Sequence, residues 1–198
     1  MFIALEGPEG AGKSTLLVSL AEGLRSHGHD VVTTREPGAT DLGQRIRDIL
    51  LDGPDMHPRA ELHLFLADRA NHVENLILPL LKQGKIVITD RHASSTVVYQ
   101  GYARGGDVEA IRALNFSATA GLEPDLIILL DVEPEVGLAR QARSDRLGGQ
   151  PLEFHEKVRE GFLSEARRDP DRWAVLHADS GAEQVAERAL GIVLMRLT

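Results

Sequence analysis

The chain has 198 residues and a formal net charge of −8, with 42% hydrophobic and 26% charged residues, so we expect one globular domain over 1–198. The negative charge argues against a nucleic-acid or anionic-membrane partner, and any polyanion must be bound by local groups. There is no cysteine, which excludes disulfides and thiolate metal sites and favours a cytoplasmic location.

Short apolar runs bounded by turn or helix-start signals are typical of buried parallel strands. They cover residues 2–6, 30–34 (the weakest), 85–89, 125–132 and 173–177. Helical patterns separate them near 13–27, 40–51, 58–83, 93–120, 134–143, 152–168 and 182–197. This alternation predicts an α/β fold, a five-stranded parallel sheet flanked by helices, with ligands at the carboxyl ends of the strands. The apolar runs are too short to cross a membrane, and the first is too short for a signal peptide.

The first predicted strand runs into GPEGAGKST (7–15), which has the frame of a phosphate-binding loop between a strand and a helix. Lys13 is expected to reach the β- and γ-phosphates of ATP, and the Ser14 hydroxyl to bind Mg²⁺. A carboxylate facing those phosphates would be costly, so we expect Glu9 to point elsewhere. The residues expected at the ATP site are Gly7, Pro8, Glu9, Gly10, Ala11, Gly12, Lys13, Ser14 and Thr15.

Such a loop identifies a triphosphate site without naming the reaction. The N/T-K-x-D motif of GTPases does not occur. Motor ATPases usually end a strand with a paired Asp-Glu, whereas Asp131 is followed by valine and Asp90 by arginine. Both observations favour a kinase that acts on a small molecule.

Charged and aromatic residues follow the later strands. TREPGAT (34–40) places Arg35 at a strand end, and DRH (90–92) does the same for an acid and a base. In FLADR (65–69), Phe65 and Arg69 share a helical face, which suits a planar base that accepts hydrogen bonds. Each feature has a structural alternative: a core phenylalanine, a solvated arginine and an ion pair at a strand end.

Together with the loop, TREPG, DRH and EPDLIILLDV (123–132) resemble the thymidylate kinases of bacteria, in order and over essentially the whole chain. The resemblance implies a three-layer P-loop fold like that of nucleoside-monophosphate kinases. It also implies transfer of the γ-phosphoryl group of ATP to dTMP, giving dTDP for dTTP biosynthesis, with Mg²⁺ as cofactor. Members of this family are usually homodimers, and the long helices predicted at 58–83 and 93–120 could supply the interface.

The resemblance also implies roles for individual residues. Phe65 would stack on thymine, and Arg69 would bond its carbonyl oxygen. Arg35 and Arg91 would hold the monophosphate, while Asp90 would order the water shell of Mg²⁺. Glu9 would accept a hydrogen bond from the 3′-hydroxyl of the acceptor sugar. The rest of the pocket would be formed by Ser95, Thr96, Tyr99 and Gln100.

Some thymidylate kinases carry an arginine in the phosphate loop, where this chain has Glu9-Gly10. We expect the replacement in RQARSDRLGGQP (140–151), a predicted closing lid. Arg143 would contact the γ-phosphate and Arg140 the adenine side; the alternative is a helix end with solvated arginines. Lys13, Arg35, Arg91 and Arg143 are therefore the predicted catalytic residues.

Two alternatives remain open. The first is another deoxynucleoside or nucleoside-monophosphate kinase, in which Glu36 would be the carboxylate that deprotonates a hydroxyl. The second is a regulatory P-loop ATPase, which would leave Phe65 and Arg69 without a role. Further arginines are interpreted as surface residues: Arg45, Arg47, Arg104, Arg112, Arg159 and Arg188.

Overall fold

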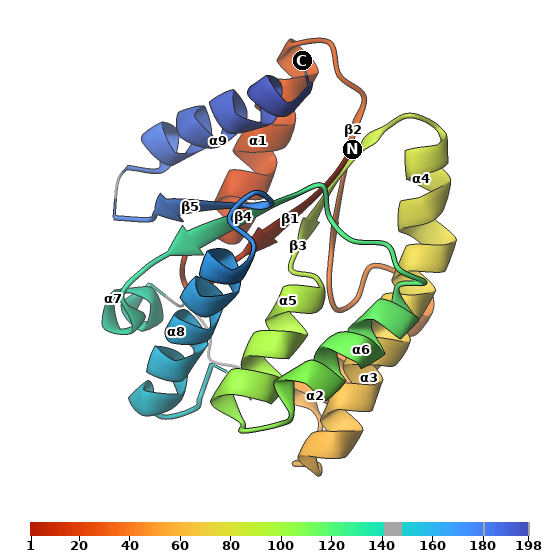
Figure 1. Ribbon diagram of the computed structural model, residues 1–198, viewed down its shortest axis with the longest axis vertical. Coiled ribbons are helices and arrows are strands. Elements are labelled where there is room, and N and C mark those ends of the chain that lie inside the picture. Colours follow the sequence, from red (N-terminus) through yellow and green to blue (C-terminus); the bar gives the residue numbers. More distant parts are fainter. Residues whose placement is uncertain (141–147, 180, 198) are drawn as a thin grey trace.

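The computed structural model describes residues 1–140, 148–179 and 181–197. Five parallel strands form one sheet in the order β2-β3-β1-β4-β5, with helices on both faces (Figure 1). The strands are β1 (Phe2–Glu6), β2 (Val31–Arg35), β3 (Ile86–Asp90), β4 (Leu126–Asp131) and β5 (Trp173–His177). The predicted fold class, a five-stranded parallel sheet flanked by helices, is confirmed.

The helices in the first half of the chain are α1 (Lys13–Ser26), α2 (Asp41–Asp52), α3 (Pro58–His72), α4 (Leu78–Lys82) and α5 (Ala93–Thr96). They are followed by α6 (Val108–Ala118), α7 (Pro134–Ala139), α8 (Leu152–Arg168) and α9 (Ala182–Leu197). Two π-helical segments, η1 (Val73–Ile77) and η2 (Val97–Ala103), continue α3 and α5. Among the described residues, the helices lack the length and apolarity needed to span a membrane.

One predicted helix is wrong in its length. The pattern over 93–120 predicts a single helix, whereas the structure has η2 and α6 separated by residues 104–107. Gly105 has a positive φ of 73° there, which ends the first helical segment. The side chain of Asp107 then accepts a hydrogen bond from Ala110 N at 3.1 Å and caps α6.

Alternate residues of the central strands enter separate hydrophobic cores, because successive side chains of a strand point to opposite faces. Ile3, Leu5 and Ile128 pack with α1 and α9 on one face. Ala4 and Ile127 pack with η2 and α8 on the other face. Figure 1 shows α1 beside α9 and shows α8 and α5 on the other side of the sheet. The molecule therefore has three layers.

The strand register brings the predicted site residues to one edge of the sheet. Asp90 of β3 is paired with Leu5 of β1 on one side and with Arg35 of β2 on the other. The phosphate loop begins immediately after β1, since Glu6 is the last residue of that strand. Segments from 7–15, 34–40 and 90–92 thus meet at the carboxyl ends of three adjacent strands.

Candidate active site

The loop between β1 and α1 has the backbone that a phosphate-binding loop requires. Gly7, Gly10 and Gly12 all have positive φ, at 148°, 65° and 93°. A Cβ on Gly10 would lie 1.8 Å from the carbonyl oxygen of Gly137, so α7 packs directly against the loop. No side chain among the described residues caps α1. The first N–H groups of α1 are therefore available to an anion.

Lys13 is held against the loop by backbone carbonyl groups. Its ammonium group donates to the carbonyl oxygens of Gly7 at 2.9 Å and Pro8 at 2.7 Å. Burial lowers the pKa of Lys13 to about 8, and the neighbouring Arg91 guanidinium acts in the same direction, although nearby carboxylates oppose both.

Two oxygen ligands suited to magnesium lie beside this lysine. The Ser14 hydroxyl donates to Asp90 Oδ2 at 2.9 Å, across the gap between α1 and β3. Mg²⁺ commonly takes one or two protein oxygens and completes its shell with water and substrate phosphates. The part of the chain that the structure describes has no group of three or more His, Cys, Asp or Glu placed to hold a metal. The residues present fit Mg²⁺ bound mainly through a nucleotide.

A cavity of about 310 Å³ opens next to the loop. All residues predicted to bind the acceptor line it: Glu9, Arg35, Phe65, Arg69, Arg91, Ser95, Thr96, Tyr99 and Gln100. Lys13, Ser14 and Asp90 line the same cavity. One space is thus shared by the phosphate loop and by the segments that follow β2 and β3.

Arg91 links the loop to the helical segment above it. One amino group of its guanidinium, Nη1, donates to the Gly7 carbonyl oxygen at 3.1 Å and to Ser95 Oγ at 3.0 Å. The other, Nη2, donates to Glu9 Oε1 at 3.3 Å and to the Tyr99 hydroxyl at 3.1 Å. Arg91 adopts a φ of 70°, a conformation that costs free energy for a residue with a Cβ and persists because these contacts hold it.

Glu9 lines the cavity, and its carboxylate lies near side chains that follow β3 and near α8. Its Oε2 lies 3.3 Å from Nδ1 of His155, a buried residue of α8. Burial alone would raise the pKa of Glu9, but His155, Arg91 and Lys13 outweigh it and lower the pKa to about 2. The His155 pKa is raised in turn, chiefly through its hydrogen bond with Glu9. Glu9 therefore stays ionised at neutral pH.

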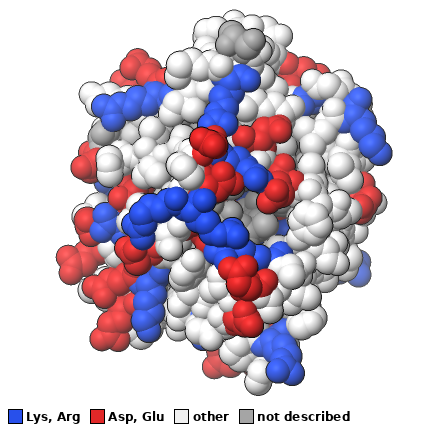
Figure 2. Space-filling model, viewed as in Figure 1, with Lys and Arg blue, Asp and Glu red and all other residues white. Residues whose placement is uncertain are grey.

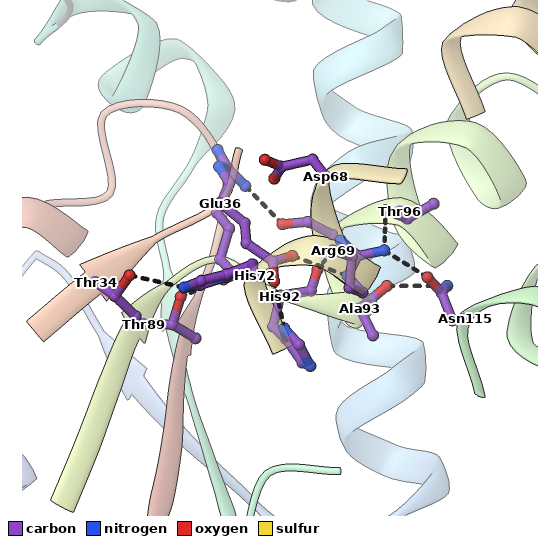
Figure 3. Close-up of polar contacts among 12 residues, drawn as sticks. Thr34, Glu36, Asp68, Arg69, His72, Thr89, His92, Ala93, Thr96 and Asn115 are labelled. Carbon is purple, nitrogen blue, oxygen red and sulfur yellow. Dashed lines mark hydrogen bonds and ion pairs between the residues drawn. The ribbon is translucent and has the colours of Figure 1, made fainter. Parts of the chain in front are cut away.

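Arg69 is not a solvated charge, because only 2% of it is exposed. Its Nε donates to Glu36 Oε2 at 2.8 Å, and Nη2 donates to the His92 carbonyl oxygen at 3.0 Å. Nη1 donates to Thr96 Oγ1 at 2.9 Å and to Asn115 Oδ1 at 2.5 Å. Figure 3 shows these groups converging on Arg69 from several elements. The guanidinium is fixed in place before any ligand binds.

Glu36 is the centre of this buried network (Figure 3). Its Oε1 lies 2.8 Å from His72 Nδ1 and 3.0 Å from His92 Nδ1, while Thr34 Oγ1 lies 2.7 Å from His72 Nε2. Burial would raise the pKa of Glu36, but Arg69 and the two histidines hold it well below its ordinary value. A carboxylate fixed in this way is poorly suited to act as the base of a nucleoside kinase.

The predicted lid is only partly described. Arg140 is exposed, and its Nη1 donates to the Ala178 carbonyl oxygen at 3.2 Å, beside the connection between β5 and α9. Arg143 lies outside the described residues. Its contact with the γ-phosphate, and the lid itself, remain predictions.

Four arginines interpreted as surface residues prove to be partly buried and bonded: Arg47, Arg104, Arg112 and Arg159. Arg47 lines the cavity and donates to the Pro37 carbonyl oxygen at 2.8 Å. In the sequence, Arg47 comes directly after Ile46 and three residues before Leu50, so the apolar spacing of this helix already predicts a place near its inner face. Glu36 and His92 line the cavity as well. The sequence suggested Glu36 only as the base of the alternative kinase, and it gave His92 no role beyond its place in DRH.

Comparison with known proteins is consistent with this site. The family model described as thymidylate kinase matches residues 5–189. A thymidylate kinase of Desulfosudis oleivorans is 48% identical over 202 residues, which cover 96% of this chain and 94% of the relative. One from a Synechococcus strain is 48% identical over 197 residues, covering 100% of this chain and 96% of the relative.

A solved structure agrees over the same length. The crystal structure of thymidylate kinase from Ehrlichia chaffeensis matches with a TM-score of 0.83 at 34% identity, covering 98% of both chains. The sequence match extends over nearly all of the chain and includes the phosphate loop and the lining of the cavity. The chain belongs to the thymidylate kinase family.

Proposed function

We propose that the protein transfers the γ-phosphoryl group of ATP to dTMP and releases ADP and dTDP. The observation that carries the proposal is the shared cavity, in which Lys13 and Ser14 of the phosphate loop face the same space as Phe65 and Arg69. The phosphates of ATP would lie at the loop and the thymine near α3, so the monophosphate of dTMP would lie between them. Arg35 and Arg91 line the same cavity and would bind this phosphate.

The chemistry needs placement and positive charge more than proton removal. An oxygen of the dTMP phosphate attacks the γ-phosphorus as the bond to the β–γ bridging oxygen breaks, and ADP leaves with that electron pair. The second pKa of a phosphate monoester is about 6, so the attacking oxygen is already ionised at pH 7. Lys13, Arg35 and Arg91 offset the charge of the three phosphate groups. Mg²⁺ held through Ser14 and Asp90 would add positive charge at the β- and γ-phosphate oxygens.

The base would lie against Phe65, which is partly exposed to the cavity. Arginine has five N–H groups. Within the described residues, Arg69 uses four of them, for Glu36, Thr96, Asn115 and His92. One N–H on Nη2 is left for a carbonyl oxygen of the base. Because the others are fixed, this donor is preorganised.

We also propose that two copies of the chain associate through the helices around α3. Support comes from large apolar side chains that are exposed on two of the helices in contact with α3: Leu42 and Ile49 on α2, Leu114 and Phe116 on α6. Phe116 is 62% exposed. Light scattering after size-exclusion chromatography should give the mass of a dimer, and Phe116→Glu should shift it towards the monomer. A monomeric wild type would refute the proposal.

We propose ATP and dTMP as the ligands of the protein, besides a second copy of the chain. We propose the cytoplasm as its location, because the chain has no cysteine and so needs no oxidising compartment for disulfide formation. On the face shown in Figure 2, basic and acidic side chains are interleaved rather than gathered into a field of one sign. Together with the net charge of −8, this supports the view that nucleic acid is not a ligand.

A coupled assay of ADP release tests the function. The acceptors compared are dTMP, dUMP, dCMP, dGMP and thymidine, with a reaction that contains no acceptor as the blank. The proposal predicts release that depends on dTMP and is far lower with thymidine. Release that prefers thymidine would favour a nucleoside kinase, and release that ignores all acceptors would favour a regulatory ATPase.

A further inference from the structure

Glu61 is a buried carboxylate that has no part in the phosphoryl transfer. It lies on α3, only 1% exposed, four residues before Phe65 and eight before Arg69. The three side chains therefore share one face of the helix. Glu61 Oε1 accepts a hydrogen bond from Gln100 Nε2 at 2.8 Å. Gln100 lines the cavity, as do Phe65 and Arg69.

Arg104 holds this carboxylate from the other side. Its Nε lies 3.0 Å from Glu61 Oε1, and its Nη2 donates to Glu61 Oε2 at 3.3 Å. The guanidinium also lies over the Phe154 ring, 5.6 Å from the ring centre. Arg104 directly follows η2, four residues after Gln100. Glu61 is thus held by the guanidinium of Arg104, four residues along the chain from the Gln100 amide that Glu61 also contacts.

The contact decides which way the Gln100 amide is turned. An amide has one donating and one accepting corner, and a carboxylate paired with a guanidinium can only accept. Gln100 must therefore direct its NH₂ group to Glu61, which removes the usual uncertainty between the two orientations of an amide. Among the described residues, none donates a hydrogen bond to the side-chain oxygen of Gln100, Oε1, whereas its backbone oxygen accepts one from Gly106 N. Oε1 is the corner left for a ligand in the cavity.

We propose that Glu61 is a positioning residue that makes the site selective for pyrimidines with an N–H at ring position 3. The inference rests on the proposed function and names the feature of the base that is recognised. Thymine and uracil would donate from N3 to Gln100 Oε1 and accept at O4 from Arg69. Cytosine has a bare N3 and an amino group at position 4, so it would meet an acceptor with a lone pair and a donor with N–H groups.

The variant Glu61→Gln tests the role of the carboxylate. A glutamine at position 61 can donate as well as accept, so the Gln100 amide can turn in either direction. The measurement is kcat/KM for dTMP and for dCMP at saturating ATP. We expect the dTMP-to-dCMP ratio to fall about tenfold, mostly through a higher KM for dTMP, because one oriented hydrogen bond is lost. The KM for ATP should not change.

Glu160→Gln is the matched control, because Glu160 is an exposed residue of α8 that pairs with Arg167 at the surface. Its ratio should equal that of the wild type. If Glu61→Gln lowers both kcat/KM values equally, the ratio stays constant and Glu61 is merely structural, which would overturn the proposal. Arg104→Met releases Glu61 from its cation and should lower the ratio in the same direction.

A third measurement uses the wild type and so does not depend on the folding of any variant. The dTMP analogue methylated at N3 has lost the proposed donor, and its kcat/KM should be at least about a hundredfold below that of dTMP. Equal use of the two acceptors would overturn the inference even if dTMP kinase activity is present. A wild type that ignores dTMP altogether would instead refute the proposed function, so the two failures are distinguishable.

Discussion

The carboxylate of Glu9 accepts a hydrogen bond from the Tyr99 hydroxyl at 2.5 Å, so an acid in the phosphate loop is directed away from the loop and towards the acceptor cavity. Tyr99 belongs to η2, ninety residues along the chain. Because the same loop holds Lys13 against its carbonyl groups, one structural element would serve both substrates of the proposed reaction. A substitution at Glu9 can therefore separate the binding of the acceptor from that of the donor.

Glu9→Ala should impair the use of dTMP much more than that of ATP. The variant removes the acceptor for Tyr99 and for Arg91, and with it the proposed contact to the sugar 3′-hydroxyl. Hydrogen bonds that involve a charged group contribute about 1.5–3 kcal/mol, so the KM for dTMP should rise at least about tenfold. Steady-state kinetics with each substrate varied in turn checks this. Equal losses for ATP and dTMP would contradict it.

The activity should depend on pH through Lys13. Its pKa is lowered by burial to about 8, so the free enzyme loses the ammonium charge as the pH rises through 8. The value of kcat/KM for ATP, which reports on the free enzyme, should decline above that pH. At saturating ATP the bound phosphates favour the charged lysine, so kcat should decline only at higher pH.

Lys13→Arg supplies the control for this pH profile. A guanidinium stays charged throughout the accessible range, so the decline near pH 8 should disappear even if the overall rate is lower. An unchanged profile in this variant would assign the decline to another group.

Glu36→Gln should strongly destabilise the protein. Arg69 is 2% exposed and Glu36 is 4% exposed, so the substitution leaves a buried cation without its counter-charge. Breaking a buried pair from one side costs about 3–5 kcal/mol. Chemical denaturation at pH 7 measures the free energy of unfolding. Glu133→Gln removes an exposed partner of Arg159 and should cost less than about 1 kcal/mol.

The same variant gives a pH test with a definite sign. The pKa of Glu36 is lowered in the folded protein, so its contribution is complete above the ordinary value of 4.5 and is lost as the pH falls below it. The difference between wild type and Glu36→Gln should therefore shrink in acid. A difference that grows below pH 4.5 would contradict the assignment.

The sequence predicted the residues at strand ends well and the buried network poorly. Arg35, Asp90 and the phosphate loop each follow an apolar strand, and parallel strands bring their carboxyl ends together whatever the details of packing. Arg69 instead contacts Asn115, which is 46 residues away, and Glu36 contacts His92, which is 56 residues away. Neither pair has a local pattern, so only the packing of α3 against α6 and the sheet reveals them.

One other difference had a signal in the sequence, whereas the contacts of Glu61 had none. Gly105-Gly106 marks the break between η2 and α6, although the apolar pattern continues on both sides. Glu61 precedes Phe65 by one turn, yet nothing local shows that Gln100 and Arg104 will meet it. Side chains that act through a partner on another element depend on tertiary structure.

Gly10→Ala should weaken ATP binding through the loop backbone. Gly10 has a φ of 65°, and a Cβ there would lie 1.8 Å from the Gly137 carbonyl oxygen, so the loop or α7 must move. A loop displaced in this way no longer directs its N–H groups at phosphate, so the KM for ATP should rise at least about tenfold.

Gly28→Ala is the control, because Gly28 has a similar φ of 85° with open space around the added Cβ, and it lies outside the loop in the sequence. It should cost only the conformational strain of about 1–2 kcal/mol and leave the KM for ATP unchanged. If both variants raise that KM equally, backbone strain rather than the contact with α7 would account for the effect.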